Sequence, residues 1–102
     1  MLAYDVIIKK RNGETLSHQE LSWFVEGFTS GEIQDYQVAA FIMAVYFRGM
    51  SAEELGAWTE AMLYSGTVLD LSSLPGPKVD KHSTGGVGDK VSLPLAPLVA
   101  AA

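Results

Sequence analysis

The sequence contains no cysteine and no long apolar run, and each absence excludes a class of protein. Without cysteine there is no disulfide framework and no thiolate metal site, which fits a reducing compartment. The longest apolar stretch, Val38 to Phe47, is much shorter than a membrane span. The N-terminus also lacks the basic and apolar segments of a signal peptide. We therefore expect a cytoplasmic protein that has no membrane partner.

Positive charge is scarce as well. The chain has 7 Lys and Arg against 12 Asp and Glu, and its formal net charge is −5. Because nonspecific nucleic-acid binding depends on basic patches, no nucleic-acid partner is expected. An anion site would have to concentrate the few cations, and Lys78, Lys81 and Lys90 do cluster. The 102 residues are 48% hydrophobic, which predicts a folded globular chain of modest domain size.

The first two-thirds of the chain predicts short helices. Two Ser-x-x-Glu segments have the spacing of a capping box, in which a serine and a glutamate satisfy the free amides at a helix start. Glycines that follow the apolar-periodic stretches predict where each helix ends. The expected helices begin at Ala3, Ser17, Asp35 and Ser51, with Asp35 as the cap of its helix, and they are closed by Asn12-Gly13, Gly31, Gly49 and Gly66.

The apolar periodicity also predicts which faces are buried. Residues 38–47 are apolar almost all round, so the helix that contains them is expected to be the central and most buried one. A basic run at residues 9–11 is expected to be a solvated helix end. His18 is expected to face solvent. The inner stripe of the helix that follows Ser51 is predicted to be Leu55, Trp58, Thr59 and Met62.

The pattern changes after residue 67. A Pro-Gly-Pro connector at residues 75–77 cannot stay helical, and it is followed by a short strand around Val79, a glycine-rich loop and an apolar helix. The predicted fold class is mainly α, with a small helical domain followed by the first strand–loop–helix unit of an α/β domain. The expected limits are 1–67 for the helical domain, 68–78 for a linker and 79–102 for the start of the α/β domain.

Residues 79–92, VDKHSTGGVGDKVS, gather anion-binding and proton-transfer groups. Glycines allow backbone N–H groups to converge on an anion, and the helix start adds positive potential. Lys81 supplies a compact cation, and His82 can exchange a proton near neutral pH. Asp89 would repel phosphate, so it is expected to orient neighbours or to help hold a cation. Additional hydroxyl donors are Ser83, Thr84 and Ser92.

The glycine spacing in this loop matches neither G-x-x-x-x-G-K-[ST] nor G-x-G-x-x-G. Composition alone therefore leaves two interpretations open. One is a site for phosphate or a phosphoester, and the other is a purely structural turn, since turns rich in glycine and serine are common.

The order of residues 81–89, KHSTGGVGD, is more specific, because it resembles the phosphate-binding signature of the thymidine and pyrimidine-nucleoside phosphorylase family. Members of that family have chains several times longer. The resemblance implies that this chain is the N-terminal portion of such an enzyme. It covers essentially the whole chain, since further segments lie in the family's order: Ile7–Gly13, Asp35–Gln37, Ser65–Gly66, Leu69–Ser72 and Leu95–Ala100.

The resemblance implies reversible phosphorolysis, in which a pyrimidine nucleoside and inorganic phosphate give the free base and a pentose 1-phosphate. It implies a homodimer joined through the helical domains, an active site between the two domains and no organic cofactor. It assigns His82 to catalysis at the departing base. It assigns phosphate binding to Lys81, Ser83 and Ser92, with a loop backbone of Gly85, Gly86 and Gly88.

Some members of the family also hold a potassium ion near this loop. The residue matching Gly88 and a threonine two positions later contribute oxygens to it, but the second position here is Lys90, which argues against a potassium site of that design. The residues that grip the base lie further along the family's chains, so we expect the isolated chain to be inactive. The alternative hypothesis is an independent, non-catalytic helical module for dimerisation or interaction.

Overall fold

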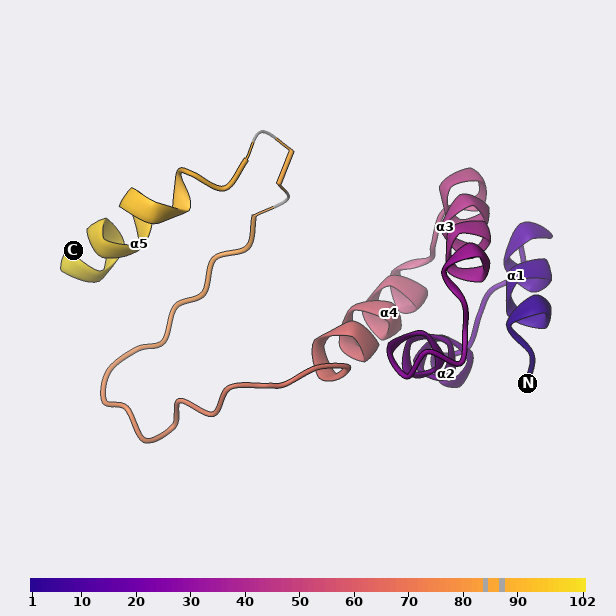
Figure 1. The fold of residues 1–102 in the computed structure, drawn as a ribbon, viewed down its shortest axis with the longest axis horizontal. Coiled ribbons are helices and arrows are strands. Elements are labelled where there is room, and N and C mark those ends of the chain that lie inside the picture. The colour runs from indigo at the N-terminus through magenta and orange to yellow at the C-terminus, as the bar shows by residue number, and fades with distance from the viewer. Residues whose placement is uncertain (84, 87) are drawn as a thin grey trace. The chain divides into compact units, whose positions relative to one another are not determined.

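The structure is a computed structural model that describes residues 1–83, 85–86 and 88–102. It divides into two compact units, Met1–Leu69 and Asp70–Ala102 (Figure 1). The described part of the chain contains helices and no strand, so the prediction of a mainly α chain is confirmed. The first unit contains α1 (Ala3–Arg11), α2 (His18–Thr29), α3 (Asp35–Arg48) and α4 (Ala52–Tyr64), and the second contains α5 (Ser92–Ala101).

The two predicted capping boxes are present. The Ser17 hydroxyl accepts a hydrogen bond from the Glu20 N–H at 3.2 Å, and the Glu20 carboxylate accepts one from the Ser17 N–H at 2.7 Å. Ser51 and Glu54 repeat this arrangement at the start of α4, with distances of 3.2 and 2.8 Å. These reciprocal bonds satisfy amides that have no partner inside the helix, which is why the starts could be predicted locally.

The start of α3 differs slightly from the prediction. Asp35 is its first helical residue rather than its cap, because Gln34 occupies the capping position. The backbone N–H of Gln34 donates to the Gln37 side-chain oxygen at 3.0 Å. A glutamine therefore makes the bond that a glutamate makes at the starts of α2 and α4.

The core of the first unit lies where α1 packs beside α3 and α2 packs beside α4 (Figure 1). An aromatic cluster occupies its centre. The rings of Phe24 and Phe41 have their centroids 4.5 Å apart, and Trp58 stacks on Phe41 at 5.2 Å. The buried members of this core are Ala3, Val6, Leu16, Leu21, Phe24, Ile33, Val38, Phe41 and Ala57.

The prediction that α3 is the most buried helix is wrong. Only one stripe of it is buried, formed by Val38, Phe41 and Ala44. The opposite face is exposed, with Tyr46 at 77% and Phe47 at 73% of their possible accessibility. The reason is that α1 and the aromatic cluster cover one side of α3 within this unit, and no other helix of the unit covers the rest.

The predicted inner stripe of α4 is also wrong at most positions. Leu55, Thr59 and Met62 are exposed, whereas Glu54 and Ala57 are buried and Trp58 is half-buried. The stripe is displaced because the Glu54 carboxylate points inward and pairs with Lys10, which is itself buried. The prediction of a fully solvated basic run at residues 9–11 is therefore wrong for Lys10.

The strand predicted around Val79 is not formed, since residues 77–83 have no helix or strand. A strand is stabilised by hydrogen bonds to a neighbouring strand, and the described residues contain none that could pair with it. Of the predicted strand–loop–helix unit, the described residues therefore contain only the helix, α5. No helix in the described part of the chain combines the length and apolar character needed to cross a membrane.

Candidate functional site

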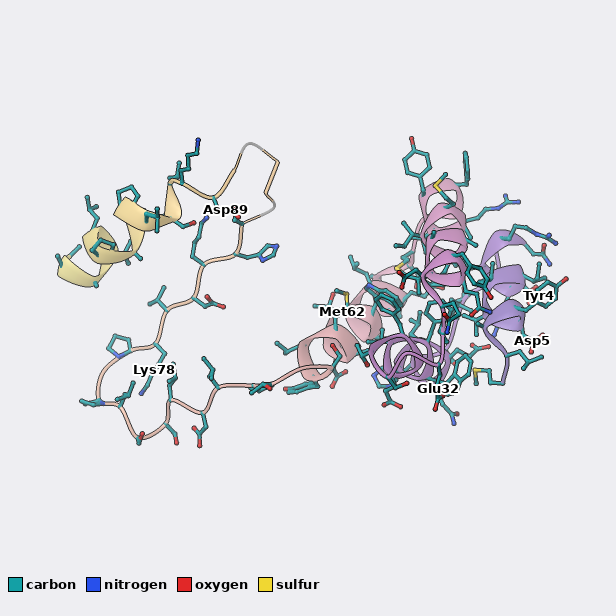
Figure 2. The ribbon with its side chains drawn as sticks, viewed as in Figure 1. Tyr4, Asp5, Glu32, Met62, Lys78 and Asp89 are labelled. Atoms are coloured by element: carbon teal, nitrogen blue, oxygen red, sulfur yellow. The ribbon has the colours of Figure 1, made fainter. Side chains whose placement is uncertain are left out.

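The glycine-rich loop lies in the second unit and leads directly into α5, with Asp89 close to the helix start (Figure 2). Gly85 has a φ angle of +71° and Gly88 one of +93°. Both angles fall in the left-handed region, which a residue with a side chain adopts only at a cost. The glycines at these positions are therefore required by the turn itself, whatever else the loop does.

Two of the predicted phosphate-binding residues are brought together across this loop. The Lys81 ammonium donates a hydrogen bond to the Ser92 hydroxyl at 2.6 Å. Ser92 is the first residue of α5 and Lys81 is exposed, so the pair lies where the N-terminal end of the helix meets solvent. An ammonium, a hydroxyl and a helix start are each suited to an anion, and their proximity makes this pair the centre of the candidate site.

Ser83, the third predicted phosphate ligand, makes contacts within the loop. Its hydroxyl donates a hydrogen bond to the Asp89 carboxylate. The same oxygen accepts a hydrogen bond from the Gly85 N–H at 3.2 Å. Asp89 is expected to orient its neighbours, and its hydrogen bond with Ser83 is a contact through which it can do so.

His82, the predicted catalytic residue, is exposed and lies between Lys81 and Ser83 in the sequence. Gly86, predicted to form part of the loop backbone, is exposed as well. The Gly88 N–H donates to the Gly85 carbonyl at 3.2 Å, which closes the turn. Thr84, which the sequence suggested as a further hydroxyl donor, lies outside the described residues.

The side-chain oxygen that the family resemblance implies for a potassium ion is missing at residue 90. The position where the resemblance places a threonine is Lys90, whose side chain carries three donors and no acceptor oxygen. The Lys90 carbonyl, in addition, accepts the Leu93 N–H at 3.3 Å in the first turn of α5. The described residues contain no group of three or more His, Cys, Asp or Glu that could hold a metal ion.

A cleft of about 200 Å³ lies in the helical unit between α2 and α4. His18 is exposed, as predicted, and its Nε2 lies 3.2 Å from a carboxylate oxygen of Glu60 at this cleft. Neither residue is buried, and the cleft contains none of the predicted site residues. Its lining is His18, Ser22, Glu26, Glu60, Ala61, Tyr64 and Ser65.

The buried pair of Lys10 and Glu54 is the charged feature that sequence reasoning missed. These residues lie 44 positions apart, so no local spacing connects them. The one available signal was the capping box of Ser51, which fixes the direction of the Glu54 side chain. It does not reveal which cation the side chain will meet.

Residues 4–66 match the model of the helical bundle domain of the glycosyl transferase family. The whole chain is also similar to curated pyrimidine-nucleoside phosphorylases. It is 54% identical over 101 residues to the one from Staphylococcus haemolyticus, 53% over 100 residues to the one from Geobacillus stearothermophilus and 54% over 101 residues to the one from Bacillus subtilis. These alignments cover 98–99% of this chain but only 23% of each relative.

Proposed function

This chain belongs to the glycosyl transferase family and contains its helical bundle domain, and from that premise we propose that it is the N-terminal part of a pyrimidine-nucleoside phosphorylase. The chain spans 23% of the length of the curated relatives that it matches. The similarity extends past the bundle at residue 66 to nearly the whole chain, and so it includes the glycine-rich loop. The proposed reaction is phosphorolysis of a pyrimidine nucleoside to the free base and a pentose 1-phosphate.

The observation that carries this proposal is the contact between Lys81 and Ser92 at 2.6 Å. These residues are 11 positions apart, and the turn at Gly85 and Gly88 is what brings them together. Among the residues that the structure describes, Lys81 uses one of its three donors on Ser92, and the Ser92 hydroxyl keeps its own proton to donate. A phosphate bound here would receive charge-assisted hydrogen bonds next to the start of α5.

His82 would act on the base rather than on phosphate. When the bond between sugar and base breaks, negative charge develops on the pyrimidine, and a proton or hydrogen bond delivered to its carbonyl stabilises that charge. Phosphate held by Lys81 next to the anomeric carbon supplies the nucleophile. An exposed histidine adjacent in sequence to the phosphate-binding lysine suits this division of labour.

We also propose that the chain forms a homodimer through α3. Its exposed face carries Ile42, Met43, Tyr46 and Phe47 at helical spacing, and the rings of the last two lie edge to face with centroids 5.3 Å apart. A contiguous apolar stripe of this kind is typical of an interaction surface.

The absence of cysteine supports a cytoplasmic location for the protein.

We expect no phosphorolysis from the 102 residues alone. The assigned residues hold phosphate and act on the leaving base, and none is assigned to gripping the base. A turnover assay with nucleoside and phosphate checks this expectation. Turnover that survives stringent purification and disappears in His82→Ala would contradict it.

The experiment that tests the phosphate site is a titration of isotopically labelled chain with inorganic phosphate, followed by amide NMR. We expect saturable shifts at Gly85, Gly86 and Gly88 that are lost in Lys81→Ala. Lys78→Ala is the matched control, because it removes the same charge from a lysine whose ammonium donates to the Leu74 carbonyl at 2.5 Å, outside the glycine-rich loop. If the unmodified chain shows no saturable shift in the loop, the alternative of a helical interaction module without a phosphate site is favoured.

A further inference from the structure

The donor groups of the loop are not equally available to an anion. A serine hydroxyl has one proton, and the Ser83 hydroxyl donates its proton to the Asp89 carboxylate. The Gly85 N–H, in turn, donates to the Ser83 oxygen at 3.2 Å. Two groups that could bind phosphate are therefore already used inside the loop: the Ser83 hydroxyl donates to Asp89, and the Gly85 N–H donates to Ser83.

Lys81 and Ser92, in contrast, do not contact the Asp89 carboxylate through the hydrogen bond that joins them. Among the described residues, the Lys81 ammonium donates one of its three protons, to the Ser92 oxygen at 2.6 Å, so within that part of the chain the pair retains protons that an incoming anion can accept. The loop thus has one half that is ready for an anion and one half that is occupied by a carboxylate of the chain itself.

A carboxylate satisfies a hydroxyl donor in the same way as a phosphate oxygen, since both are anionic acceptors of charge-assisted hydrogen bonds. We propose that Asp89 is an internal competitor of phosphate: its carboxylate holds Ser83 in the phosphate-free loop, and phosphate must displace it to receive the Ser83 proton. This inference rests on the proposed phosphate site. It gives Asp89 a regulatory role in that site, because the competition sets how strongly an anion must bind to enter.

The side chain of Asp89 can be separated experimentally from its backbone. The Asp89 carbonyl accepts the Ser92 N–H at 3.0 Å and so contributes to the start of α5, and a side-chain substitution leaves that bond in place. A purely structural role for the carboxylate predicts that removing it loosens the loop and weakens phosphate binding. Competition predicts the opposite sign, because the released hydroxyl becomes available to phosphate.

The test compares the dissociation constant for inorganic phosphate of the unmodified chain with that of Asp89→Asn, measured by amide NMR titration. An amide oxygen has the shape of the carboxylate but is a weaker acceptor, so we expect Asp89→Asn to bind phosphate about tenfold more tightly. Asp80→Asn is the matched control. It removes the same charge from the same segment, but the Asp80 carboxylate accepts the Lys81 backbone N–H at 2.7 Å rather than the Ser83 hydroxyl.

Each outcome decides one point. A larger gain in affinity for Asp89→Asn than for Asp80→Asn supports the competition. If the unmodified chain binds phosphate and Asp89→Asn binds equally or more weakly, the inference is overturned while the phosphate site stands. If none of the variants binds phosphate, the site and the inference are both overturned.

A second variant tests whether the effect passes through Ser83. In a Ser83→Ala background there is no hydroxyl for the carboxylate to hold, so Asp89→Asn is expected to give no more gain than Asp80→Asn. If the full gain persists in that background, it comes from the lost charge alone, and competition through Ser83 is wrong.

Discussion

Lys10 and Glu54 form a buried ion pair that joins α1 to α4. The Lys10 Nζ lies 2.8 Å from both carboxylate oxygens of Glu54, and the two residues are 3% and 2% exposed. The same carboxylate accepts the N–H of Leu16 and that of Ser51, each at 2.8 Å. The Glu54 side chain thus connects α1, the segment before α2 and the start of α4. Both of its carboxylate oxygens accept hydrogen bonds.

Removing one partner of this pair is expected to be costly. Lys10→Met leaves the Glu54 carboxylate buried without its cation, and breaking a buried pair in this way typically costs about 3–5 kcal/mol of unfolding free energy. Urea unfolding measures the loss. Lys9→Met is the matched control: the Lys9 to Glu20 pair has the same residue types at 2.9 Å, but its side chains are 33% and 19% exposed. Its loss is expected to be about 1 kcal/mol or less.

A loss in Lys10→Met no greater than that in Lys9→Met would contradict the assignment of the buried pair. The double variant Lys10→Met with Glu54→Leu removes both charges together. It is expected to recover part of the loss, since no unpaired charge then remains in the core.

The stability of the helical unit is expected to fall on acidification. Burial raises the pKa of the Glu54 carboxyl, but the hydrogen bonds it accepts and the charge of Lys10 outweigh burial, and its pKa lies below the ordinary 4.5. Burial also raises the pKa of the Glu20 carboxyl. Its hydrogen bonds with Ser17 and Lys9 outweigh that effect, so the pKa of Glu20 is lowered as well. The unfolded chain therefore binds more protons, so the contribution is complete above pH 4.5 and is lost as the pH falls through the folded-state values.

Unfolding midpoints measured across a pH series check this dependence. Glu54→Gln cannot titrate, so its stability is expected to change less with pH in the acid range than that of the unmodified chain. An equally steep loss of stability in Glu54→Gln would show that other carboxyl groups are responsible.

Phe47→Glu is expected to dissociate the proposed homodimer. Phe47 is 73% exposed in the structure, so the substitution is tolerated by the fold, but it would place an unpaired charge in an apolar interface. We expect the dimer dissociation constant to rise by about a hundredfold or more, which sedimentation measures. Leu63→Glu is the control, because Leu63 is 60% exposed on α4 rather than α3. Equal dissociation by both variants, or a monomeric unmodified chain, would contradict a dimer through α3.

His82→Ala is expected to separate catalysis from phosphate binding. His82 is assigned to the base and not to phosphate, so its loss should change the phosphate dissociation constant by about twofold or less. Lys81→Ala should weaken binding by about tenfold or more, because it removes a charge-assisted donor. In a longer enzyme that contains this chain, His82→Ala should lower turnover by about 10²–10⁴-fold. A loss of phosphate affinity equal to that of Lys81→Ala would contradict the role of His82 at the base.

The sequence by itself determined the local features of this protein. The helix starts at Ser17 and Ser51 follow from hydrogen bonds between residues three positions apart. The order of residues 81–89 carries the resemblance to the phosphorylase signature. Each of these features depends only on near neighbours in the chain, which is why a pattern could predict it. The resemblance to the phosphorylase family also lies in residue order, and the matching domain and relatives confirm it.

The tertiary structure alone decided which faces are buried. An all-round apolar helix such as α3 predicts burial everywhere, but its actual burial depends on the helices that pack against it, which cover only the stripe at Val38 and Phe41. Lys10 resembles any lysine at a helix end until the fold places it against Glu54, 44 residues away. The strand expected at Val79 is absent for the same reason. A strand requires a neighbouring strand as its partner, and a local sequence pattern does not supply one.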